Sequence, residues 1–252
     1  MSLESQSPQK VLERIDVGRI LSAAFAALRL RLGDLLAVAV FFLLVPQVLL
    51  GFAPEQFPDP QSAVWTLMAA LPSLVFNGAA SLILYGALTN ATGPTAAEAI
   101  RSGVLKLSHL FVVGLLGGLA ILAGLVLVAP GLYLAAGWLV ATPLLMIENT
   151  SAIEALKQSH RLSQGSRWRL LGVILMLTAI TVGLATVGVS ILSVVTLVAS
   201  NEIVKRVSIF IVGPVLAVVV RLVLMAVVTS AYAELKRVGG GMPATQVDQT
   251  FG

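Results

Sequence analysis

The chain has 252 residues, of which 58% are hydrophobic and only 11% are charged, and its mean hydropathy is +0.97. Soluble domains carry about 25% charged residues, so this composition predicts an integral membrane protein. The net charge is +4, but the basic residues flank apolar runs, which favours a membrane surface over nucleic acid as their partner. The absence of cysteine excludes disulfides, thiolate metal sites and cysteine nucleophiles.

A surface helix and a first span are predicted at the start of the chain. Apolar residues recur with a helical period beside several arginines after Asp16, a plausible N-cap, which predicts a helix over 16–32 lying on the membrane. Gly33 and Asp34 break this pattern. Residues 35–52 then carry almost no charge, and at about 1.5 Å per residue they are long enough to cross most of a hydrocarbon core of about 30 Å.

The next segment is a loop followed by a second span. Residues 53–62 hold three prolines and two acidic residues but no basic residue, so the loop is predicted to face away from the cytoplasm. Residues 63–89 are apolar apart from interruptions at Pro72 and Asn77, and they are long enough to cross the membrane with some tilt.

Two further spans are predicted in the middle of the chain. Thr95 and Glu98 have the spacing of a capping box, which predicts a helix start. The apolar stretch that follows is too long for one crossing, and Ala129-Pro130-Gly131 interrupts it near its centre. We therefore expect two spans joined by a tight turn, at 110–128 and 131–147.

A polar and basic segment at 151–172, here called the central segment, separates two apolar runs. Ser151 and Glu154 repeat the capping-box spacing, and Gly165 suits a left-handed helix end. Apolar side chains on one face and basic ones on the other predict another amphipathic surface helix, lying on the inner leaflet. The residues expected to face anionic lipid headgroups or a membrane partner are Lys157, Arg161, Arg167, Trp168 and Arg169.

The fifth and sixth spans are predicted at 170–199 and 207–232, joined by a short polar connection. The termini, residues 1–15 and 238–252, are expected to be disordered or mobile. With the amino terminus in the cytoplasm, thirteen of the sixteen Lys and Arg residues fall on the inner side. This asymmetry favours six spans with both termini cytoplasmic.

The predicted fold is therefore an all-α polytopic membrane domain over 16–237, with six transmembrane helices and three inner-leaflet amphipathic helices. The helix starts near residues 16, 95 and 151 suggest three repeats of a unit made of a surface helix and a transmembrane hairpin. A small-residue ridge at Gly114 and Gly118 suits close helix contact, within the chain or in a homo-oligomer.

No catalytic pattern stands out in the sequence. It contains no His-Glu-x-x-His, phosphate loop or Gly-x-Ser-x-Gly, and His109 and His160 lie at helix edges, which favours interfacial roles over metal binding. We therefore expect no enzyme activity, no cofactor and no metal site.

Arg221 lies inside the sixth predicted span, roughly 15 Å from the inner surface at about 1.5 Å per residue. An ionisable residue at such a depth is a functional-site hypothesis, and the alternative is that it reaches the headgroups or makes a structural hydrogen bond. The candidate intramembrane partners are Asp34, Asn77 and Glu148.

Prolines occur in four predicted spans. Broken helices can mark transporter sites, whereas kinks made by proline are also common in packed membrane bundles. The four residues are Pro46, Pro72, Pro143 and Pro214.

Several short motifs carry a family resemblance. They are Pro130-Gly-Leu-Tyr, Ala141-Thr-Pro-Leu-Leu-Met-Ile-Glu, Glu154-Ala-Leu-Lys-Gln-Ser, Leu162-Ser-Gln-Gly-Ser-Arg-Trp-Arg and Tyr232-Ala-Glu-Leu-Lys. With them, the chain resembles bacterial inner-membrane proteins of the glycerophosphoryl diester phosphodiesterase membrane-domain family, related to the YciC-like proteins. The resemblance implies a multi-pass inner-membrane protein. The hydrolase domain that gives the family its name has no room in a chain used by six spans.

Three functions are compatible with this sequence. The leading hypothesis is a non-enzymatic membrane module that binds lipid or a membrane partner through its basic cytoplasmic face. The alternative is a small transporter or channel-like protein that uses the proline-broken helices and Arg221. A third possibility is a membrane partner of a separately encoded phosphodiesterase.

Overall fold

The computed structural model describes residues 16–51, 63–89, 93–125, 128–199, 201, 204–205 and 208–238. Within these ranges the regular secondary structure is entirely helical, which confirms the all-α class. The predictions made for residues 1–15, for the 53–62 loop and for the tail after Val238 lie outside the described residues.

The first surface helix forms where the sequence predicts it. Helix α1 spans Val17–Leu30, and the Asp16 carboxylate caps it by accepting a hydrogen bond of 2.8 Å from the Gly18 amide. Such a cap satisfies one of the amides that the first helical turn leaves without a partner. The buried face of α1 is made of small and aliphatic side chains, Ile20, Ala23, Ala24 and Ala27.

The predicted break at Gly33 and Asp34 is wrong by two to three residues. The chain turns at Arg31, and α2 (Leu32–Ala39) begins immediately afterwards. Asp34 lies in the first turn of α2, where a negative charge is favoured by the helix dipole, and accepts from Arg31 Nε at 2.7 Å. The same arginine donates to the Pro94 carbonyl at 2.9 Å, which connects the turn between α1 and α2 to the residues just before Ala96.

The first span is a continuous helical path interrupted by a π-helical turn. After α2 come η1 (Val40–Leu44) and α3 (Val45–Gly51), and the Val45 amide bonds to the Val40 carbonyl. Pro46 has no amide hydrogen, and in a regular helix its ring would clash with the carbonyl four residues earlier. The wider turn ahead of Pro46 relieves this clash.

Helix α4 (Ala63–Leu88) forms the second span and contains Pro72 within its length. Phe76, Ile83 and Leu84 of this helix are fully buried. Helix α4 contacts α1, α2, α5, α6, α8 and α12, so it lies at the centre of the bundle.

The segment from residue 95 to residue 148 departs most from the prediction. It contains α5 (Ala96–Leu105), α6 (Leu107–Leu125), α7 (Val128–Trp138) and α8 (Ala141–Glu148). The predicted span 131–147 is divided between α7 and α8, which are separated by Leu139 and Val140. Ala129-Pro130-Gly131 does not interrupt a helix but stands at the start of α7, where proline is tolerated because that turn lacks helical partners for its amides.

The last part of the chain contains α9 (Ala152–Leu162), α10 (Arg167–Val198), η2 (Ser208–Val212) and α12 (Gly213–Val238). Gly165 adopts a positive φ of 84° in the turn between α9 and α10, as its sequence context predicts. Only half of the capping box predicted at Ser151 forms. Ser151 Oγ accepts from the Glu154 amide at 3.4 Å, whereas the Glu154 carboxylate accepts from the Gln158 side chain. At Thr95 the reciprocal pair with Glu98 is complete.

Four helical segments among the described residues are long and apolar enough to cross a membrane: Leu32–Leu49, Ala70–Leu88, Arg167–Val198 and Gly213–Val238. A fifth is counted if α5 and α6, which meet at an angle of 67°, form one broken span. The chain is thus an all-helical protein with four to five candidate spans. The apolar segment Tyr133–Glu148, which covers most of the predicted span 131–147, is shorter than these candidates and is not counted among them.

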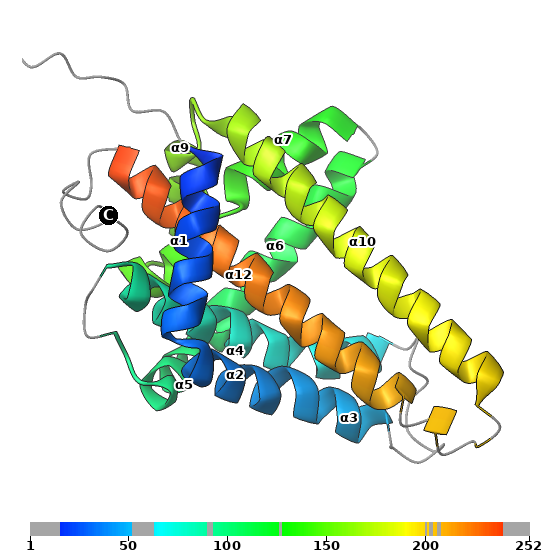
Figure 1. Ribbon diagram of the computed structural model, residues 1–252. Coiled ribbons are helices and arrows are strands. Elements are labelled where there is room, and N and C mark those ends of the chain that lie inside the picture. The colour runs from blue at the N-terminus through cyan, green and yellow to red at the C-terminus, as the bar shows by residue number, and fades with distance from the viewer. Residues whose placement is uncertain are drawn as a thin grey trace, which may run out of the picture.

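Figure 1 shows how these segments are arranged, with α12 running beside α4 and α10 lying along one side of the bundle. Helix α1 runs across the direction of α12 rather than along it. Only 17% of the residues in a strongly apolar 18-residue stretch of α10 are buried. An apolar face of this size is suited to contact with lipid chains.

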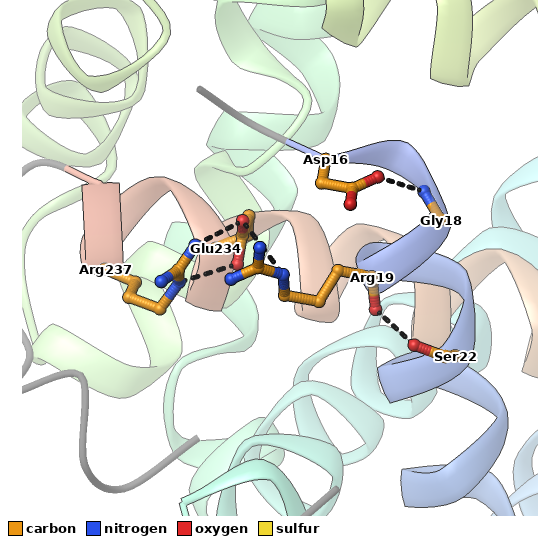
Figure 2. A network of polar contacts seen from close by, with 6 residues as sticks. All are labelled: Asp16, Gly18, Arg19, Ser22, Glu234 and Arg237. Atoms are coloured by element: carbon orange, nitrogen blue, oxygen red, sulfur yellow. Dashed lines mark hydrogen bonds and ion pairs between the residues drawn. The ribbon is translucent and has the colours of Figure 1, made fainter. Parts of the chain in front are cut away.

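A buried ionic cluster joins α1 to the end of α12 (Figure 2). The Glu234 carboxylate accepts two hydrogen bonds from the guanidinium of Arg237, at 3.0 and 2.9 Å, and lies 4.0 Å from Arg19 Nε. The side chain of Arg237 is only 2% exposed. The end of α12 is therefore part of the packed core.

Candidate functional site

Helix α9 is fixed against α7 by two buried serines. Ser159 Oγ donates to the Gly137 carbonyl at 2.8 Å, and Ser163 Oγ approaches the same oxygen at 3.4 Å. A Cβ atom on Gly137 would lie 2.9 Å from Nδ1 of His160. Only glycine therefore allows α7 to approach the imidazole of α9 this closely.

Arg167, at the start of α10, folds back onto this pair of helices. Its Nη2 lies 2.8 Å from His160 Nε2 and 3.2 Å from the His160 carbonyl, and its Cζ stands 4.0 Å from the centre of the Tyr133 ring. Because a guanidinium can only donate, His160 Nε2 is the acceptor in this contact. His160 thus orients an arginine, and the described residues contain no cluster of metal-ligating side chains.

One nitrogen of this arginine has no hydrogen-bond partner among the described residues. Arg167 is only 9% exposed, and its buried Nε makes no hydrogen bond. A buried donor without a partner costs about 1–3 kcal/mol. The guanidinium is therefore stacked and oriented, and one of its donors is left unsatisfied.

This arginine borders a cavity of about 570 Å³, here called the Arg167 hollow. Trp168 stands at its edge with 87% of its surface exposed. Aromatic rings with a polar nitrogen favour the boundary between lipid chains and headgroups. The residues lining the hollow are Tyr133, His160, Gln164, Gly165, Arg167, Trp168 and Leu171.

A second cavity, of about 720 Å³, lies on the other side of His160 and is here called the α9 groove. Its wall is mainly apolar, formed by side chains such as Leu116, Leu134 and Trp138. Lys157 and Arg161 of α9 border it with their basic groups. The two cavities together place basic groups beside an apolar surface.

The residues predicted from the central segment therefore gather at one corner of the fold. Lys157 and Arg161 border the α9 groove, and Arg167 and Trp168 border the Arg167 hollow. Arg169 lies in the same first turn of α10 but lines neither cavity. The site also needs Tyr133, which was not singled out as a site residue, although it ends the motif Pro130-Gly-Leu-Tyr.

The predicted partners of Arg221 are wrong. Asp34 pairs with Arg31. Glu148 accepts from the Tyr232 hydroxyl at 2.8 Å and lies 3.0 Å from Lys236 Nζ. Glu148 is held at the end of α12 by these contacts, and Lys236 is fifteen residues from Arg221, roughly 22 Å along the helix.

Asn77, the third candidate partner of Arg221, does not bond it either. Its Oδ1 is buried and has no hydrogen-bond partner among the described residues. Arg221 itself lines two cavities, one shared with Gln47 and Ser73 and the other formed by α10 and α12.

A comparison with known families identifies the segment that carries these features. A family model described as the membrane domain of glycerophosphoryl diester phosphodiesterase matches residues 111–237, which is 127 of the 252 residues. The match includes both walls of the Arg167 hollow and Arg221. Neither a curated protein nor a solved structure matches the chain.

Proposed function

Because the chain belongs to the glycerophosphoryl diester phosphodiesterase membrane-domain family, we propose that it is a non-catalytic membrane module that binds an anionic phospholipid at the Arg167 hollow and the α9 groove. The observation that carries this proposal is Arg167, a buried guanidinium that stacks on Tyr133 and lines the Arg167 hollow, and whose Nε has no hydrogen-bond partner among the described residues. Arginine suits phosphate because its planar fork matches two oxygens at once.

The surroundings of Arg167 fit an amphiphile better than a free anion. The α9 groove offers an apolar wall next to the hollow, and Lys157 and Arg161 stand at its border. A headgroup phosphate at Arg167 would leave an acyl chain free to lie along this wall. Each basic residue near an anionic leaflet adds about 1 kcal/mol of attraction.

The same proposal includes a topology. We propose six spans, with α7 and α8 together forming one broken crossing, and both termini on the cytoplasmic side of a bacterial inner membrane. The distribution of Lys and Arg in the sequence supports this orientation. A single cysteine in the Lys157→Cys variant should react with an impermeant maleimide only after the inner face is opened, and labelling from outside in intact cells would refute the orientation.

Native mass spectrometry of the protein released in mild detergent tests lipid binding. The Arg167→Gln variant should retain phosphatidylglycerol roughly 10- to 100-fold less well than wild type, since a hydrogen bond to a charged group contributes about 1.5–3 kcal/mol. Arg101→Gln is the matched control, because Arg101 is an exposed basic residue of α5 that lines neither cavity. Equal loss in both variants would mean that general charge, and not this site, holds the lipid.

A second candidate function is that of a membrane partner for a separately encoded phosphodiesterase, and the family match favours it. In this case the basic face would contact the enzyme. Crosslinking in native membranes followed by mass spectrometry tests the idea. The absence of any hydrolase crosslinked to the central segment would refute it.

The transport alternative is favoured by one observation, the position of Arg221 beside two cavities. Solute flux into proteoliposomes that disappears in Arg221→Gln would support it. Retained lipid without any flux would support the binding module.

A further inference from the structure

A cavity of about 430 Å³ lies between the first span, α4 and α12, and is here called the Arg221 cavity. It shares no lining residue with the Arg167 hollow or with the α9 groove. Its lining residues from the first span and α4 are Phe42, Leu43, Pro46, Gln47, Ala70 and Ser73, and α12 contributes Pro214, Ala217, Val218 and Arg221.

Two interrupted helices meet at this cavity. In each of the two spans a π-helical turn is followed, two residues later, by a proline that lines the wall: η1 precedes Pro46 and η2 precedes Pro214. Helix α3 also packs against η2. Turns of this kind widen the helix and often occur at functional sites.

Arg221 is the only formally charged residue among the described residues in the wall of the Arg221 cavity. No hydrogen bond or ion pair joins Arg221 to the described residues, and the residue is exposed on the protein surface. It lies eight residues after the start of α12 at Gly213, roughly 12 Å along the helix, and roughly 22 Å before Lys236. A cation at this depth needs a counter-charge, and none of the described residues that line the cavity carries a carboxylate.

Other groups in the wall can complete an anion site. Gln47 presents an exposed carboxamide, whose nitrogen has two donors. The Ser73 hydroxyl donates its hydrogen to the Ala70 carbonyl, at 2.7 Å, so this hydrogen is not available to an anion. The donors available to an anion are therefore the guanidinium fork and the Gln47 amide.

Arg221 also borders an apolar groove of about 440 Å³ between α10 and α12, and Ala217 lines both spaces. We propose that Arg221 binds the phosphate of an anionic lipid in the Arg221 cavity, while one acyl chain of that lipid lies in the α10–α12 groove. This is a second lipid site, which shares no lining residue with the site at α9 and does not depend on it.

A reporter placed inside the cavity tests the proposal. Because the chain has no cysteine, the Ser73→Cys variant can be labelled with a trifluoroethyl group at that position alone. The ¹⁹F resonance of this group then reports on the cavity. The matched control is a tag at Ser190→Cys, on the exposed face of α10 and outside both spaces. Phosphatidylglycerol is titrated into micelles of tagged protein, with phosphatidylcholine and inorganic phosphate as the comparison probes.

We expect phosphatidylglycerol to shift the Ser73→Cys resonance to saturation. In the Arg221→Gln background the half-saturating lipid fraction should rise about tenfold or more. Phosphatidylcholine and inorganic phosphate should produce no saturable shift, and the control tag should not respond to Arg221. Arg167→Gln should leave the Ser73→Cys titration unchanged. The titration therefore tests lipid binding at the Arg221 cavity independently of lipid binding at the Arg167 hollow.

Three results would overturn the proposal. They are an unchanged titration in Arg221→Gln, an equal response to phosphatidylcholine, and saturation by inorganic phosphate, which would assign the cavity to a free anion. If Arg221→Gln does not fold, Arg221→Lys gives the test, because it keeps the charge but loses the fork. Binding should then weaken, and unchanged binding would refute the role of the guanidinium.

Discussion

The ionic cluster at Glu234 gives the most quantitative prediction about stability. The Glu234→Gln substitution keeps the shape of the side chain but removes the charge that compensates Arg237, whose side chain is 2% exposed. Removing one partner of a buried ion pair costs about 3–5 kcal/mol, because the remaining charge stays buried. Arg19, at 4.0 Å and 37% exposed, adds at most about 1 kcal/mol.

Arg237 makes a further contact in the fold, so the cost should fall at the lower end, near 3 kcal/mol. This corresponds to a roughly 100-fold change in the unfolding equilibrium constant. Far-UV circular dichroism during titration of mixed micelles with dodecyl sulfate measures the difference in unfolding free energy.

The chain supplies a matched control. Asp34 and Arg31 form an ion pair with three-residue spacing like that of Glu234 and Arg237, but the Asp34 side chain is 41% exposed. Asp34→Asn should cost only about 0.5 kcal/mol. Equal costs for the two substitutions would refute the argument from burial.

Three further predictions concern helix starts and the site. The Thr95 amide, and then its hydroxyl, lower the pKa of Glu98, so the cap stabilises the fold at neutral pH and is lost as pH falls through that lowered pKa; Glu98→Gln should remove this acid dependence in pH-dependent unfolding. Gly137→Ala should destabilise by about 1–3 kcal/mol in the same titration, whereas Gly172→Ala, in open space on α10, should be neutral or stabilising. Tyr133→Leu removes the ring under a guanidinium and should weaken phosphatidylglycerol retention by about fivefold in native mass spectrometry, with unchanged retention as the contrary result.

Much of the local structure follows from short-range chemistry. Asp16 and Thr95 begin helices because their side-chain oxygens reach amides two or three residues away. Gly165 takes the left-handed conformation that its place in a turn requires. The long apolar stretches of α4, α10 and α12 are equally visible, because length and composition alone define a candidate span.

The pairing of distant polar groups could not be predicted in this way. The Tyr232 hydroxyl reaches Glu148 across 84 positions of sequence, and Lys236 binds the same carboxylate, which removes Glu148 as a partner for Arg221. Arg167 was expected to face headgroups, yet it stacks on Tyr133 from another helix. These outcomes depend on how α7, α8 and α12 pack, and helical periodicity does not contain that information.

The most direct test of the proposed lipid site is photo-crosslinking with phosphatidylglycerol that carries a diazirine next to the phosphate, in vesicles of phosphatidylethanolamine and phosphatidylglycerol. Mass spectrometry of the digested protein locates the attached lipid. The proposed function predicts attachment around the Arg167 hollow, on the peptides containing Tyr133 or residues 164–171, and a strong reduction in Arg167→Gln. Attachment spread along the exposed face of α10, with no change in that variant, would contradict a lipid site at this corner and leave only general contact with the bilayer.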